Sequence, residues 1–202
     1  MTTTRQRILC GTLSLTAIAL VVSPAVVSAA ASNTNTTVTA TVGSSISITS
    51  SGTVAISVTP TAGGVVSSAG DTVTVNTNNA SGYTLTLSDA DTNTNLISGG
   101  NNIAAHTGTL ASPTTLGNNS WGYRIVNAGG FGATAYSAET NNASSTSTWA
   151  GVPSSASPAT VKTTGASASN DTTQVWYGLR ATSSQPNGAY SDTVTYSATT
   201  NP

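Results

Sequence analysis

The residues that could carry acid, base or nucleophilic chemistry are few in this 202-residue sequence. Its one histidine is His106. Its acidic residues are Asp71, Asp89, Asp91, Glu139, Asp171 and Asp192. A serine nucleophile needs a histidine base beside it, and no Gly-x-Ser-x-Gly motif presents one. Most of the acids stand in or beside turn-like segments, where Asp is favoured for structural reasons. We therefore predict that the protein is not an enzyme and has no catalytic residue.

One segment has the spacing of a metal-binding loop. Side-chain oxygens occur at alternate positions in residues 89–95, on Asp89, Asp91, Asn93 and Asn95. Calcium loops use this spacing because it directs successive donors at one centre. The segment lacks the glycine at the sixth loop position, and Gly100 stands where such a loop has a bidentate acid. Calcium binding and simple turn formation are the two interpretations, and no other cofactor is predicted.

Three aromatic residues, Phe131, Tyr136 and Trp149, stand in Gly- and Ser-rich sequence where loops are expected. An aromatic ring in a loop either stacks on a sugar or fills the end of a hydrophobic core. Core filling is the favoured interpretation. The three remain the candidate ligand-binding residues.

The charge content limits the class of partner. Charged residues make up 5% of the sequence, against about 25% in ordinary soluble proteins. Only five residues are basic, and two of these, Arg5 and Arg7, lie at the N-terminus. No basic stripe is available to contact phosphates, so nucleic-acid binding is not expected.

The N-terminus has the order of a secretory signal. Arg5 and Arg7 precede an apolar stretch at residues 8–22, and small residues follow Pro24. This predicts a signal peptide over residues 1–29, with cleavage after Ala29 or Ala31. The remaining chain has no cysteine, because Cys10 is the only one. We expect a secreted protein, extracellular or on the cell surface, with no membrane insertion after cleavage.

Strand-like alternation of apolar and polar residues recurs through the rest of the chain. It is clearest in residues 71–77, 82–88, 121–127, 173–181 and 189–199. The turn-forming residues 78–82 join the first two, which predicts a β-hairpin. Residues 36–42, 45–49 and 53–59 are three further predicted strands, and residues 89–116 and 129–159 are predicted long loops with one short strand each.

These elements predict an all-β protein. About eight or nine short strands in a chain of this length favour one domain, residues 30–202, built as an antiparallel β-sandwich. The arrangement would be immunoglobulin-like or jelly-roll-like. In such a fold Trp121, Tyr123 and Ile125 face inward and Arg124 faces outward, while Val175, Tyr177 and Leu179 face inward opposite Trp176 and Arg180.

Residues 177–178 and 188–196 resemble the closing hairpin of spore coat protein U-like domains and archaic fimbrial subunits. Residues 78–87 are similar to small secreted β-sandwich proteins of bacterial surfaces. The disulfide common in fimbrial subunits is absent. The resemblance implies a structural or adhesive role outside the cell and carries over no catalytic residue.

Two functions follow from this resemblance. The first is a coat, filament or surface-decoration subunit whose partner is itself or another surface protein. Fimbrial subunits accept a strand from the next subunit. The candidate donor here is residues 33–42, in an N-terminal segment 32–42 that is either flexible or a donor strand. Its alternative role is the first strand of its own sheet. The second function is an adhesin that recognises glycan or protein through the loop aromatics.

Overall fold

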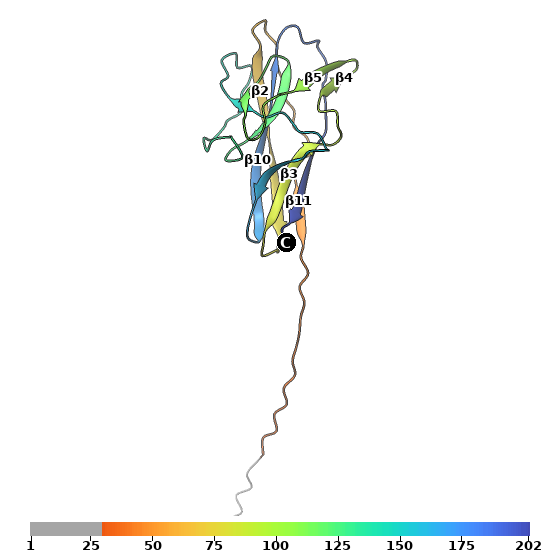
Figure 1. Cartoon of the computed structure of the whole chain (residues 1–202), viewed down its shortest axis with the longest axis vertical. Helices are drawn as coiled ribbons and strands as arrows, with labels where there is room; N and C mark the ends of the chain where they lie inside the picture. Colours follow the sequence, from red (N-terminus) through yellow and green to blue (C-terminus); the bar gives the residue numbers. More distant parts are fainter. Residues whose placement is uncertain (1–29) are drawn as a thin grey trace, which may run out of the picture. The chain divides into compact units, whose positions relative to one another are not determined.

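The computed structural model describes residues 30–202, and the predicted signal peptide lies outside this range. The chain divides into two units at residues 41 and 42, and every strand lies in the second unit. A six-stranded sheet has the order β1 (Ile46–Thr49), β2 (Val65–Thr77), β10 (Ala168–Ala181), β7 (Ser120–Ile125), β5 (Asn101–Ala105) and β4 (Leu96–Ser98) (Figure 1). A three-stranded sheet has the order β11 (Val194–Thr200), β3 (Tyr83–Asp89) and β9 (Ala159–Thr163). A third, two-stranded sheet pairs β6 (Thr114–Thr115) with β8 (Thr148–Trp149).

The predicted all-β, sandwich-like class is confirmed. The strands are antiparallel except for β5 and β7, which pair in parallel. Within residues 30–202 eleven strands form instead of eight or nine, because β4, β6 and β8 are pieces of only two or three residues. The segment 89–116 contains three short strands where one was expected.

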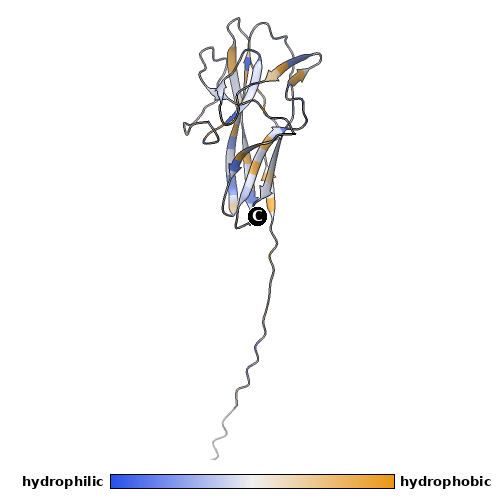
Figure 2. Ribbon diagram, viewed as in Figure 1, coloured by the Kyte–Doolittle hydropathy of each residue, from blue (hydrophilic) through white to orange (hydrophobic). Residues whose placement is uncertain are grey.

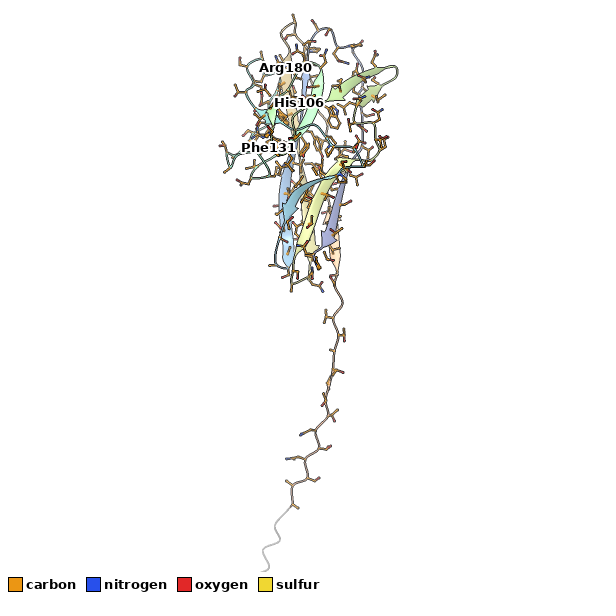
Figure 3. The ribbon with its side chains drawn as sticks, in the orientation of Figure 1. His106, Phe131 and Arg180 are labelled. Atoms are coloured by element: carbon orange, nitrogen blue, oxygen red, sulfur yellow. The ribbon has the colours of Figure 1, made fainter. Side chains whose placement is uncertain are left out.

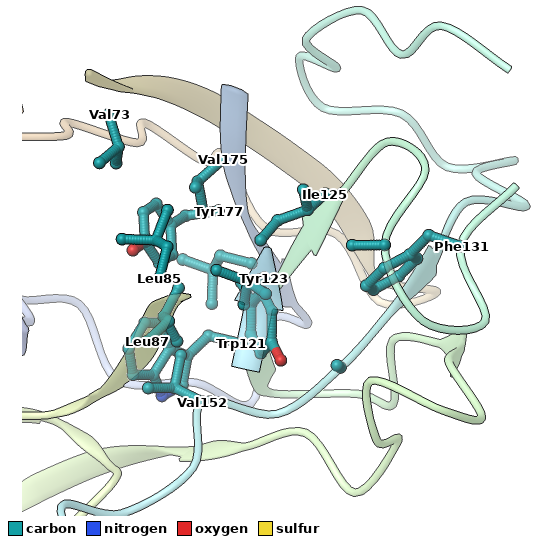
Figure 4. Close-up of a cluster of buried hydrophobic side chains, with 14 of the residues drawn as sticks. Val73, Leu85, Leu87, Trp121, Tyr123, Ile125, Phe131, Val152, Val175 and Tyr177 are labelled. Carbon is teal, nitrogen blue, oxygen red and sulfur yellow. The ribbon is translucent and has the colours of Figure 1, made fainter. Parts of the chain in front are cut away.

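The core lies between the six-stranded and three-stranded sheets. Side chains two apart on each strand point into it, as on β3, where Tyr83, Leu85 and Leu87 are fully buried. Figure 2 shows apolar residues interspersed with hydrophilic ones along the strands, and Figure 4 shows the buried cluster that results. The facing side chains of β2, β7 and β10 complete this cluster. Period-two patterning therefore identified the inward residues correctly.

Two predicted hairpins are wrong. The strands on either side of residues 78–82 form, but β2 pairs with β1 and β10 while β3 pairs with β11 and β9. Residues 78–82 thus connect one sheet to the other. The turn is held by Gly82, at φ 78°, and by the Asn79 side-chain amide, which donates to the carbonyl of Gly82. In the same way β10 and β11 lie in different sheets, so the expected closing hairpin is absent.

Two predicted strands do not form. Residues 36–42 have no strand pairing and are exposed, so the prediction that they begin the domain's own sheet is wrong. Residues 53–59 also lack strand pairing, yet Val54, Ile56 and Val58 are half-buried against the core while the residues between them are exposed. The alternation that suggested a strand is real there, but no neighbouring strand takes its backbone hydrogen bonds.

The six-stranded sheet is also covered on its outer face. Gly122 of β7 lies directly opposite Gly178 of β10, and both point outward. A Cβ at Gly178 would lie 2.5 Å from the ring of Trp149, and one at Gly122 would collide with the carbonyl oxygen of Ala150. The two glycines therefore provide the space in which residues 149 and 150 lie, and a second, smaller core of Val66, Leu116 and Trp149 forms on this face.

An ion pair joins the two main sheets. Lys162 of β9 contacts Asp171 of β10 at 2.5 Å, and the hydroxyl of Tyr83 on β3 donates to the other carboxylate oxygen at 2.8 Å. Partial burial would raise the pKa of Asp171, but the hydrogen bonds from Lys162 and Tyr83 outweigh it and lower that pKa. The carboxylate form is thus favoured by two groups of the opposite sheet.

We predict that Gly122→Ala destabilises the domain by about 1–3 kcal/mol, because the added methyl group meets backbone rather than a movable side chain. Gly165→Ala is the matched control, since a Cβ there has nothing within 4 Å. Its effect should stay within about 0.5 kcal/mol. Chemical denaturation measures both values, and equal stabilities of the two variants would contradict the role given to the glycine pair.

We also predict that Asp171 stabilises the fold in a pH-dependent manner. A carboxyl group with a lowered pKa in the folded state contributes stability above its unfolded pKa of about 3.9, and the contribution is lost as pH falls toward the folded value. The melting temperature of the protein should exceed that of Asp171→Asn by a constant amount above about pH 5, and the difference should shrink below about pH 4. A difference that does not change with pH would contradict this assignment.

Candidate functional site

The predicted calcium segment begins at the end of β3. Asp89 is the last residue of the strand, and its Oδ1 accepts a hydrogen bond from the backbone N–H of Asp91 at 2.9 Å. Asp91 Oδ1 accepts from the N–H of Asn93 at 2.6 Å, and Asn93 Oδ1 accepts from Asn95 at 3.4 Å. Each side chain therefore caps the backbone two residues ahead, as Asx turns do. The turn-forming interpretation accounts for one oxygen of each of these three residues.

The structure adds Asp192 to this group. Antiparallel pairing of β3 and β11 sets Asp89 opposite Val194, and the N–H of Ala90 donates to the carbonyl of Thr193 at 2.9 Å. This pairing brings Asp192, the residue before Thr193, close to the end of β3. Partial desolvation is the main cause that raises the pKa of Asp192 to about 6, and the neighbouring Asp89 and Asp91 carboxylates add to it. The N–H of Thr193 acts in the opposite direction.

The two carboxyl groups differ in environment. Asp89 is 1% exposed, and its Oδ2 has no hydrogen-bond partner. Asp192 lies on the exposed side of the pair. Within residues 30–202, no three His, Cys, Asp or Glu side chains are grouped closely enough to hold a metal ion by themselves. An ion at this place would need backbone, amide or water oxygens in addition.

Of the three loop aromatics, Phe131 packs in the main core, whereas Trp149 lies in the smaller outer core with Tyr136 packed against it. Phe131 is 4% exposed and packs edge-on against Tyr123, with ring centroids 6.3 Å apart. Trp149 is fully buried and meets the ring of Tyr136 edge-on at 5.5 Å. The guanidinium of Arg124 lies 4.4 Å from the centre of the Tyr136 ring and 5.7 Å from that of Phe131. Arg124, predicted to face outward, therefore links these rings by cation–π contacts.

A partly buried acid holds the loop around Tyr136 in place. Glu139 accepts hydrogen bonds from the hydroxyls of Tyr136 and Ser147 and from the side-chain amide of Asn142. Burial alone would raise the pKa of Glu139, but hydrogen bonds from serine, amide and tyrosine groups outweigh it and lower that pKa. Burial is also the main cause that raises the pKa of Tyr136 to about 12. The loop is therefore fixed by an ionised carboxylate surrounded by donors.

Contacts of this kind are those of side chains that fill a protein core. Stacking on a sugar needs an open ring face, and the rings of Phe131 and Trp149 are inside the protein. Tyr136 is half-buried between Trp149 and Trp176. A hollow of about 500 Å³ along residues 164–172 is lined by none of the three predicted ligand-binding aromatics.

His106 lies just after β5 and contacts the short strand β6. Its Nε2 shares a hydrogen bond with the hydroxyl of Thr114 at 2.8 Å, and partial burial lowers the pKa of its ring. Figure 3 shows its position among the upper loops. In the part of the chain that the structure describes, no hydrogen bond joins this ring to a carboxylate, which a triad would require.

No protein-family model, curated protein or solved structure matches this chain. Among residues 30–202, no helix has the length and apolar character needed to cross a membrane.

We predict that Trp149→Ala lowers the free energy of unfolding by about 3–5 kcal/mol, the usual cost of removing a fully buried aromatic side chain. Tyr136→Phe, which removes only the hydroxyl bonded to Ser68 and Glu139, should cost about 1 kcal/mol. Urea denaturation measures both. A Trp149→Ala protein as stable as the parent would show that the ring is free to serve a ligand.

Proposed function

We propose that the protein is a non-catalytic structural subunit of the cell surface or extracellular space, which assembles with further copies of itself by strand addition. The observation that carries this proposal is the unpaired extended segment 53–59. Secretion is part of the proposal and is supported by the signal-like N-terminal sequence.

The segment 53–59 has the properties of an acceptor. Its apolar side chains, Val54, Ile56 and Val58, already lie against the core. Among the described residues, no backbone hydrogen bond is found for residues 54–58, and the N–H of Thr59 is satisfied only by the side chain of Asn141. A row of free N–H and C=O groups on an extended backbone is a template for an incoming strand.

Residues 33–42 have the properties of a donor. Val38, Ala40 and Val42 alternate with threonines, which suits a strand with one apolar face. Val38 and Val42 are 86% and 85% exposed, two of the three large hydrophobic residues that the described chain leaves exposed. An apolar face of this kind gains stability when it is covered.

The composition supports close association of copies. Charged residues are only 5% of the sequence, and residues 30–202 have three basic and six acidic residues, a formal net charge of −3, so copies repel each other weakly. The alternative, an adhesin that binds glycan or protein through Phe131, Tyr136 and Trp149, is less favoured because two of these rings are buried.

We predict that deletion of residues 32–42 converts polymers into monomers. Val38→Asp should do the same, because it places a charge on the face that the acceptor covers. Thr39→Asp is the matched control, since it changes the opposite face of the same strand and should still assemble. Light scattering and electron microscopy measure assembly, and polymers that persist in the deletion would refute the donor role.

We predict further that Ser57→Pro blocks assembly from the acceptor side. Ser57 is exposed and its N–H makes no hydrogen bond within the described chain, so proline removes a donor needed only for pairing. The melting temperature of the isolated subunit should change little. Normal assembly of this variant would mean that strand addition occurs elsewhere.

A further inference from the structure

Asp89 is a buried acid without a full set of partners. Its side chain is 1% exposed at the end of β3, and one carboxylate oxygen accepts the N–H of Asp91 while the other, Oδ2, accepts nothing. A buried carboxylate without compensation is costly, and proteins satisfy such groups with donors, cations or bound metal ions. The unpartnered Oδ2 therefore points to a missing partner.

No cationic side chain supplies that partner. The one ion pair among residues 30–202 joins Lys162 to Asp171. The β3–β11 pairing instead brings a second acid, Asp192, next to the end of β3, where the N–H of Ala90 donates to the carbonyl of Thr193. A cation between these carboxyl groups would remove their repulsion.

We propose that Asp89 and Asp192 bind a calcium ion, with nearby backbone carbonyl and water oxygens completing its coordination. The donors available here are oxygens alone, which suits a hard cation and not zinc or copper. Calcium accepts six to eight oxygen ligands in irregular geometry, including carbonyls and waters, so two carboxylates are sufficient.

This site differs from the loop predicted from the sequence. The side-chain oxygens of Asn93 and Asn95 are not required, and Asp192 comes from a segment about a hundred residues further along the chain. The ion would therefore join the loop after β3 to the loop before β11. These loops already meet through Ala90 and Thr193, and through mutual backbone hydrogen bonds of Ile97 and Ser191.

Trp121 provides a direct reporter of binding. Its indole N–H donates to the carbonyl of Thr94 at 2.9 Å, which holds the ring against the proposed loop. Terbium replaces calcium at oxygen sites and emits when a nearby tryptophan transfers energy to it. Terbium luminescence excited through tryptophan, displaced by added calcium, would measure occupancy in the whole mature protein.

The test compares the parent with Asp192→Asn and with Asp171→Asn, which removes an acid far from the site. We expect calcium at about 100 times its Kd to raise the melting temperature of the parent and of Asp171→Asn by roughly 5–10 °C. Asp192→Asn should bind terbium and calcium at least about tenfold more weakly. Circular dichroism confirms that each variant is folded.

Three results would overturn the proposal: no calcium response in the parent, an Asp192→Asn response equal to that of the parent, or an equal response to magnesium at the same concentration. If Asp192→Asn does not fold, displacement of terbium by calcium in the parent still decides whether the site exists.

Discussion

The structure depends on the burial of both faces of the strand pair β7 and β10. All six residues of β7 are buried, although only Trp121, Tyr123 and Ile125 form an apolar face. A strand covered on both sides usually reads as a continuous apolar run. Here the second face is made of Ser120, Gly122 and Arg124, and it is covered by loop residues and the two-residue strand β8 instead of one of the two main sheets. The domain therefore has three layers at this end. The glycine pair sets the distance between the six-stranded sheet and the residues that cover its outer face.

This constraint explains why a loop rich in Gly, Ser and Asn holds one conformation. Without the buried ring of Trp149 and the hydrogen bonds to Glu139, residues 129–153 would have little to offset their conformational entropy. With them, the loop contributes its own small core and the Arg124 guanidinium is held between two aromatic rings. The scarcity of aromatic residues in the chain makes each of these contacts more important, because few other large side chains are available.

The inward residues could be predicted from the sequence, since alternation depends only on local backbone geometry. The partners of each strand could not, because a strand with one apolar face fits equally into a hairpin or into the opposite sheet. Residues 78–82 show this: Asn79 and Gly82 form a tight turn, and the chain uses it to change sheets. The outer core was missed for a different reason. Gly122 and Gly178 have no apolar side chain, and their role appears only when Trp149 is placed over them.

The candidate sites show the same contrast between features that depend on local sequence and features that depend on long-range strand pairing. Asp89 and Asp91 were recognisable because their spacing is local, whereas Asp192 joins them only through the register of β3 with β11. The sequence identifies the loop aromatics as either core or ligand-binding residues, but their burial does not follow from their position in the sequence.

Segment 53–59 is the most informative difference between the predicted strands and the structure. Its alternation of apolar and polar residues is as predicted, but its strand pairing is absent. A chain that folds its apolar side chains inward and leaves the backbone of the same segment unpaired has completed its core without completing its sheet. That incompleteness sets the segment apart from an ordinary loop, in which neither the side chains nor the backbone would be arranged for a strand.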